Sequence, residues 1–175
     1  MQNLRYVGKN LFIEKLSIKN ILKKQKTPFY IYSENQIVFN YLNFVKTFKK
    51  TNPLICFAAK SNSNTNILRV LGKLGAGADV VSGGELLKAL KAGIKAKKIV
   101  FSGVGKTEEE LKIAISKKIL LINCESEIVH DTVNQSCGSA SANVREIDSN
   151  NTWNRASREQ RFPSRIRVDR NKSGA

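Results

Sequence analysis

Lys60 is the residue whose position most strongly suggests chemistry. It follows the apolar residues 55–59, which predict a buried strand, and such a strand has no natural place for an ammonium group. One interpretation is structural: the stem of the lysine packs and its charged head reaches water. The other is chemical, because burial at a strand end lowers the pKa of a lysine and the neutral amine then attacks an aldehyde. The polar residues 62–64 would hydrogen-bond a polar cofactor held at Lys60.

Other residues, most of them polar, fall at or near the ends of further expected strands. Because the carboxyl ends of parallel strands meet at one edge of a sheet, we expect these side chains to gather near Lys60. The set comprises Asp79, Ser82, Ser102, Gly103, Asn123 and Glu125.

The elements that must position these residues alternate between strand and helix. Aromatic and β-branched runs predict strands, and apolar residues at helical spacing predict the helices that follow them. The expected strands are 27–33, 54–59, 78–81, 98–103 and 119–125, and the expected helices are 33–50, 65–75, 84–93 and 107–118. Ser33 and Thr107 are the expected helix N-caps, with Glu110 completing a capping box. Repeated units of this kind predict an α/β fold with a parallel sheet, either doubly wound or a (β/α)₈ barrel.

Several classes of site are disfavoured by the sequence. Cys56, Cys124 and Cys137 have no metal-type spacing and His130 is the single histidine, so we expect no metal. Residues 75–80 and 103–107 are rich in glycine, yet neither fits a dinucleotide fingerprint or a phosphate loop. The chain has neither a membrane-spanning apolar run nor a signal peptide, and we expect a cytoplasmic protein.

The formal net charge of +16 raises nucleic-acid binding as an alternative function. The lysines are spread along the chain, and no zinc finger, RNP motif or tight basic block accompanies them. We therefore expect no specific nucleic-acid partner.

The composition changes abruptly near residue 127. Residues 1–127 carry 20 Lys and 2 Arg, whereas residues 128–175 carry 1 Lys and 7 Arg. The second segment also lacks an apolar period, so we expect it to be disordered or loosely held and to add nothing to a packed core. It is either an arginine-rich RNA-binding tail or a segment that does not belong with the rest, such as the product of a frameshift. The expected organisation is a leader (1–26), an incomplete barrel (27–127) and this irregular tail.

A series of motifs carries a resemblance to a known family. In chain order they are "TPFYIYSE" (27–34), "ICFAAKSNSN" (55–64), "LRVLGKLGAGADVVSGGEL" (68–86), "KALKAGIKAKKIVFSGVGKTEEEL" (88–111) and "LLINCESE" (120–127). Over about residues 10–127 the chain resembles the first part of diaminopimelate decarboxylase, a fold-type III enzyme that depends on pyridoxal 5'-phosphate (PLP). The resemblance implies part of an alanine-racemase-like barrel, with Lys60 as the lysine that bonds to PLP. It also implies that Asp79 and Glu85 lie close to the cofactor. The plainer interpretations are a turn carboxylate for Asp79 and a favourable helix-dipole contact for Glu85.

The family function implied by this resemblance is decarboxylation of meso-diaminopimelate to L-lysine and CO₂. Family members are homodimers that share active sites and take a small amino-acid substrate. Because later family motifs are missing from residues 128–175, we expect these 175 residues to be a catalytically incomplete fragment. His130 has the wrong context for the family's ring-stacking histidine. The alternatives are a small non-enzymatic PLP-binding protein and, less favoured, a basic nucleic-acid-binding protein.

Overall fold

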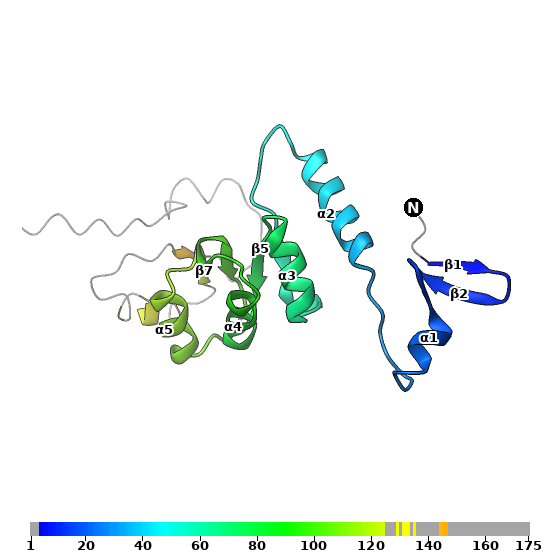
Figure 1. The fold of residues 1–175 in the computed structure, drawn as a ribbon. Helices are drawn as coiled ribbons and strands as arrows, with labels where there is room; N and C mark the ends of the chain where they lie inside the picture. Colours follow the sequence, from blue (N-terminus) through cyan, green and yellow to red (C-terminus); the bar gives the residue numbers. More distant parts are fainter. Residues whose placement is uncertain (1–3, 125–128, 130, 134, 136–143, 147–175) are drawn as a thin grey trace, which may run out of the picture. The chain divides into compact units, whose positions relative to one another are not determined.

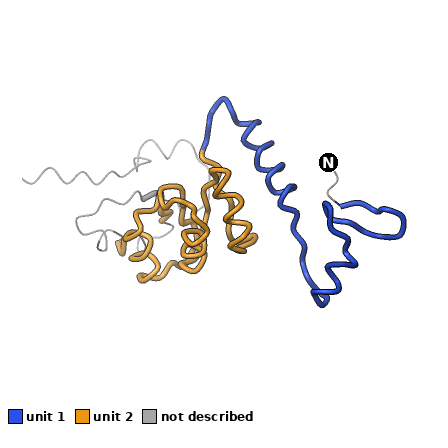
Figure 2. The backbone as a smooth tube through the Cα atoms, in the orientation of Figure 1, with its two compact units in different colours: residues 1–53 blue, residues 54–175 orange. Residues whose placement is uncertain are grey.

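The chain forms two compact units, residues 1–53 and residues 54–175, which are taken separately below (Figure 2). The structure is a computed structural model that describes residues 4–124, 129, 131–133, 135 and 144–146. None of the helices in these ranges is long and apolar enough to cross a membrane.

The first unit begins with a small antiparallel sheet that the sequence analysis did not predict. Strands β1 (Leu4–Val7), β2 (Asn10–Ile13) and β3 (Leu16–Ser17) pair in chain order, and helix α1 (Ile18–Leu22) follows. The first hairpin turns at Gly8, whose φ of 58° suits glycine. The expected leader is therefore a folded hairpin with a third strand.

Helix α2 (Glu34–Thr47) begins where the sequence predicts. The side chain of Ser33 accepts a hydrogen bond from the Gln36 N–H at 3.1 Å, which confirms Ser33 as the N-cap. The Ser33 hydroxyl also donates to Glu14 at 2.5 Å.

The strand predicted over 27–33 is wrong, since those residues have no regular structure. Their aromatic content produced the prediction, but a strand also needs a hydrogen-bonded neighbour and Pro28 has no N–H to donate. The side chains of Tyr30 and Tyr32 are exposed.

The second unit is built on a parallel sheet flanked by helices (Figure 1). Its strands are β4 (Cys56–Ala58), β5 (Gly77–Val80), β6 (Ile99–Phe101), β7 (Leu121–Cys124) and β8 (Val144–Glu146). Its helices are α3 (Thr65–Lys73), α4 (Gly83–Lys91) and α5 (Glu108–Ser116), with 3₁₀ turns η1 (Ala59–Ser61) and η2 (Ala96–Lys98). Gly75 and Gly93 follow α3 and α4 with φ of 94° and 90°, as expected of helix-ending glycines.

The order of the strands decides between the two predicted architectures. Neighbours in the sheet follow one another along the chain, β4-β5-β6-β7-β8, and all are parallel. A doubly wound sheet reverses direction at a switch point, whereas a barrel adds each strand on the same side of the last. The described strands are thus singly wound, as in part of a (β/α) barrel.

The core lies between the sheet and its helices. Successive residues of a strand face opposite sides, and the helix-facing set is the buried one. Helices α3 and α4 contact β5, and α4 also contacts β6. The buried strand residues are Ala78, Val80, Ile99, Phe101, Ile122 and Cys124, and the helices contribute Leu68, Leu86, Ala89, Leu111 and Ala114.

The segment after residue 127 does contribute to this core, contrary to expectation. Val133 is fully buried in it and Val129 packs against it. Strand β8 pairs with β7, with Val144 opposite Ile122. A short strand can be added through backbone hydrogen bonds alone, so the weak apolar pattern did not reveal it. The other residues of the expected tail, 128, 130, 134, 136–143 and 147–175, lie outside the described residues.

Candidate functional site

Lys60 lies directly beyond the carboxyl end of β4, in the 3₁₀ turn η1. Ala59 before it is fully buried, while Lys60 itself is exposed. The turn is closed by two hydrogen bonds, from the Ser61 hydroxyl to the Ala58 carbonyl at 2.8 Å and from the Asn62 N–H to the Ala59 carbonyl at 3.1 Å. Strand β4 is thus half-buried and ends at Ala58, and the turn after it carries the lysine out to solvent instead of desolvating it.

The polar residues that follow Lys60 hold the local backbone. Asn62 Oδ1 accepts from the Asn64 N–H at 3.0 Å, and Asn64 Oδ1 accepts from the Asn66 N–H at 2.9 Å and so caps α3. Ser63 accepts a hydrogen bond from Lys88 Nζ of α4 at 3.0 Å. These side chains fix the turn that presents Lys60.

Asp79 lies on β5, the neighbour of the Lys60 strand. It pairs in register with Ala58 of β4 and faces away from the buried Ala78 and Val80. One of its carboxylate oxygens, Oδ1, accepts a hydrogen bond from the hydroxyl of Ser102, which follows β6. The structure thus brings together two of the predicted strand-end residues, from adjacent strands.

Glu85 is the third residue of α4, and its contacts are those of a helix start. Its Oε2 accepts from the Val81 N–H at 2.9 Å, and its own N–H donates to the Ser82 hydroxyl at 3.2 Å. The carboxylate therefore ties the end of β5 to the first turn of α4. These bonds, together with the helix dipole, match its plainer interpretation.

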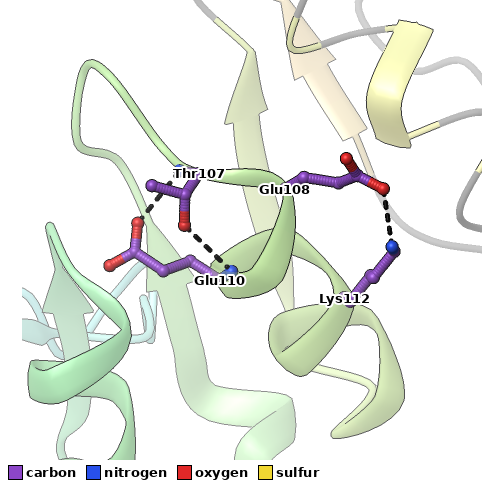
Figure 3. Close-up of polar contacts among 4 residues, drawn as sticks. All are labelled: Thr107, Glu108, Glu110 and Lys112. Atoms are coloured by element: carbon purple, nitrogen blue, oxygen red, sulfur yellow. Dashed lines mark hydrogen bonds and ion pairs between the residues drawn. The ribbon is translucent and has the colours of Figure 1, made fainter.

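Glu110 joins two helix starts, a role that its sequence position does not reveal. As predicted, Thr107 and Glu110 form a capping box at the start of α5, with Thr107 N–H donating to Glu110 Oε2 at 3.0 Å (Figure 3). The other oxygen, Oε1, accepts from the Gly83 N–H of α4 at 2.7 Å. The N–H groups of Gly83 and then Thr107 lower the pKa of the Glu110 carboxyl below its usual value. The Gly83 contact spans 27 residues, so no local motif could have indicated it.

Lys106 is a second residue that the sequence analysis did not single out. Among the residues that the structure describes, it is the one charged residue that is buried. Its Nζ donates to the Gly103 carbonyl and lies 5.5 Å from the centre of the Phe101 ring. A cation–π contact and a hydrogen bond thus hold the loop between β6 and α5.

The candidate site is the carboxyl edge of this sheet. It holds Lys60 after β4, Asp79 on β5 and Ser102 after β6. Asn123 on β7 faces the same side as Asp79 by the register of β5, β6 and β7. Its Oδ1 is buried and has no hydrogen-bond partner among the described residues. Glu125 lies outside those residues, and within them no three His, Cys, Asp or Glu side chains gather around a possible metal.

Comparison with protein families gives a match over most of the chain. Residues 34–162 match the family model described as "Pyridoxal-dependent decarboxylase, pyridoxal binding domain". The match runs past residue 127, where the resemblance was expected to end. The segment after 127 therefore includes residues that match the family.

Individual relatives agree with this match. The chain is 46% identical over 135 residues to diaminopimelate decarboxylase of Aquifex aeolicus, covering 77% of this chain and 32% of that protein. It is 47% identical over 123 residues to diaminopimelate decarboxylase of Helicobacter pylori strain J99, covering 69% and 30%. The chain thus spans about a third of the length of these curated relatives.

Solved structures lead to the same family. A crystal structure of diaminopimelate decarboxylase from M. jannaschii superimposes with a TM-score of 0.78 at 35% identity, over 82% of this chain and 35% of that one. An arginine decarboxylase from Paramecium bursaria Chlorella virus, 19% identical with a TM-score of 0.64 over 74% of this chain and 34% of that one, shares the fold. The chain therefore belongs to the pyridoxal-dependent decarboxylases and carries part of their pyridoxal binding domain.

Proposed function

We propose that this chain is the amino-terminal part of a diaminopimelate decarboxylase, which releases CO₂ from meso-diaminopimelate and leaves L-lysine. The observation that carries the proposal is the place of Lys60, exposed on a fixed turn at the carboxyl edge of a parallel sheet. The relatives that share this region at 46% and 47% identity bear that enzyme's name. The proposed substrate is a small amino acid, and the proposed compartment is the cytoplasm.

The residues of the sheet edge suit PLP. An aldehyde needs an accessible amine, and the exposed side chain of Lys60 supplies one. Asp79 provides a carboxylate on the adjacent strand, and the buried Oδ1 of Asn123 leaves an acceptor for a donor on a ligand. When bound, PLP supplies an electron sink for the electrons left behind as the substrate carboxylate departs.

The proposed role of each residue follows from its contacts. Lys60 would hold the cofactor covalently through its Nζ. Asp79, fixed by the Ser102 hydroxyl, offers a negative charge beside the Lys60 strand to a cationic group. Glu85 has an indirect role in the site, because its hydrogen bond from the Val81 N–H holds the end of β5, the strand that carries Asp79.

The 175 residues alone are proposed to be catalytically incomplete. They span about a third of their curated relatives, and the described sheet has five of the strands of a barrel. Holding substrate and catalytic groups in a reactive geometry lowers an activation barrier by roughly 7–11 kcal/mol. This contribution requires the rest of the active site. A homodimer with shared sites is the proposed assembly of the whole enzyme.

A chimaera tests this function. Residues 1–124 would replace the matching region of the Helicobacter pylori diaminopimelate decarboxylase, and lysine and CO₂ release from meso-diaminopimelate would be measured with PLP. We expect turnover by the chimaera, none by its Lys60→Ala variant, and none above free PLP by the 175-residue chain. A folded chimaera that binds PLP yet leaves meso-diaminopimelate unchanged would contradict the proposed substrate.

A further inference from the structure

Ser102 directly follows β6 and lies beside the end of β5. Its hydroxyl donates a hydrogen bond to Oδ1 of Asp79 on the adjacent strand β5, and the two residues are 23 positions apart in the sequence. Its backbone N–H donates to the Val80 carbonyl at 2.9 Å, which continues the pairing of β5 and β6 beyond the end of β6. Side chain and main chain of Ser102 therefore both bind the end of β5.

The register explains why the two side chains meet. Asp79 pairs with Val100 of β6, and side chains two residues apart on a strand face the same side. Ser102 comes two residues after Val100, so it lies on the face that carries Asp79 and one step nearer the carboxyl edge. Both residues are half-buried, which shields their hydrogen bond from competing water.

The backbone next to Ser102 is held in place as well. A Cβ atom on Gly103 would collide with the Val81 carbonyl oxygen and lie 2.9 Å from the Val81 Cα, so glycine is required for this close approach. The same Gly103 carbonyl accepts the hydrogen bond from buried Lys106. The hydroxyl of Ser102 is therefore presented to Asp79 from a fixed loop.

We infer that Ser102 is a positioning residue of the PLP site, acting through Asp79. By holding Oδ1 it selects one orientation of the carboxylate and leaves Oδ2 for a donor on the ligand or on Lys60. The same bond disperses some of the negative charge of Asp79. This inference rests on the proposed function, since it assumes that Asp79 serves the cofactor.

The test uses the 175-residue chain and PLP. The chain is incubated with PLP and reduced with borohydride, and labelling of Lys60 is measured by peptide mass spectrometry. The PLP concentration that gives half-maximal labelling is then compared among variants. Ser102→Ala should raise this concentration about three- to tenfold, whereas Ser102→Thr, which keeps a hydroxyl, should stay within about twofold of the parent. Ser116→Ala is the matched control, because the Ser116 hydroxyl donates only to the Ile113 carbonyl within α5.

A double-mutant cycle separates positioning from mere folding. In an Asp79→Ala background, which has no side-chain acceptor, Ser102→Ala should cause little further loss, since both substitutions remove the same hydrogen bond. The urea midpoint of each variant reports on folding independently, and Ser102→Cys replaces the alanine variant if that one does not fold. Unchanged labelling in Ser102→Ala, or an equal loss in the Asp79→Ala background, would overturn the inference. If the parent chain were not labelled at Lys60, the proposed function itself would fail.

Discussion

Removing the Glu110 carboxylate should uncouple two helix starts at once. Glu110→Ala deletes the acceptor for the Gly83 N–H at 2.7 Å and the acceptor for the Thr107 N–H at 3.0 Å. The first bond, charge-assisted and half-buried, contributes about 1.5 kcal/mol. The capping-box arm adds about 0.5 kcal/mol. We expect a loss of about 2 kcal/mol in the free energy of unfolding, a change of roughly 30-fold in the folding equilibrium.

Urea unfolding of the 175-residue chain, followed by circular dichroism, measures this loss. Glu109→Ala is the matched control, because Glu109 is exposed in the same first turn of α5 and contributes mainly through the helix dipole. Its loss should be a few tenths of a kcal/mol. Hydrogen exchange measures the effect at each helix start. The amides of Gly83 and Thr107 should exchange faster in Glu110→Ala than in the parent chain. After correction for global unfolding, the amide of Leu68 in α3 should exchange at the parent rate.

The pH dependence has a definite sign. The folded-state pKa of Glu110 lies below the usual glutamate value of 4.5, because the N–H groups of Gly83 and Thr107 favour the charged form. The stabilisation is therefore complete above about pH 4.5 and disappears as the pH falls through the lower folded value. The difference between the parent and Glu110→Gln should shrink on acidification over that window. A Glu110→Ala variant no less stable than Glu109→Ala, or a difference that grows at low pH, would refute this reasoning.

Three further perturbations follow from the same contacts. Gly103→Ala should lower the free energy of unfolding by about 1–3 kcal/mol, since the added methyl group would collide with the Val81 backbone. Gly84→Ala is the control and should be neutral or stabilising, because there is room for its methyl group. The urea midpoints of the two variants measure the difference. Burial, and after it the charge of Asp79, raises the pKa of the Cys56 thiol. Iodoacetamide should therefore alkylate Cys56 at pH 7.5 more slowly than it alkylates free cysteine, and the Asp79→Asn variant should react faster than the parent chain. Equal rates in parent and variant would show that Asp79 does not act on the thiol. Limited digestion with the broadly specific protease proteinase K should give products that retain β8, because Val133 is buried and β8 pairs with β7. A stable product ending between residues 125 and 135 would contradict that packing.

The local elements of the second unit could be predicted from the sequence because their signals are local. Thr107 and Glu110 stand three residues apart, and Gly75 and Gly93 directly follow helical patterns, so each helix boundary had its cause within a few residues. The strand expected at 27–33 failed because aromatic content cannot show whether a neighbouring strand is present. Strand β8 was missed for the opposite reason, since its partner β7 defines it more than its own residues do.

The candidate site divides in the same way. The positions of Lys60, Asp79 and Ser102 at strand ends could be predicted, since each follows or ends an apolar run. That Ser102 bonds to Asp79, and Glu110 to Gly83, depends on register and helix packing over 23 and 27 residues. The exposure of Lys60 was one of the two interpretations of the sequence, but the 3₁₀ turn that carries it was not predicted, because a one-turn 3₁₀ helix has no distinct sequence pattern.

The assignment of Lys60 as the residue that bonds to PLP is the central claim, and chemical trapping tests it most directly. The 175-residue chain would be incubated with increasing PLP, reduced with borohydride and mapped by peptide mass spectrometry. We expect an adduct on Lys60 at lower PLP concentration than on the exposed Lys112 of α5, and its loss in Lys60→Arg with labelling of Lys112 unchanged. Adducts spread evenly over exposed lysines, with the total unaffected by Lys60→Arg, would contradict the account.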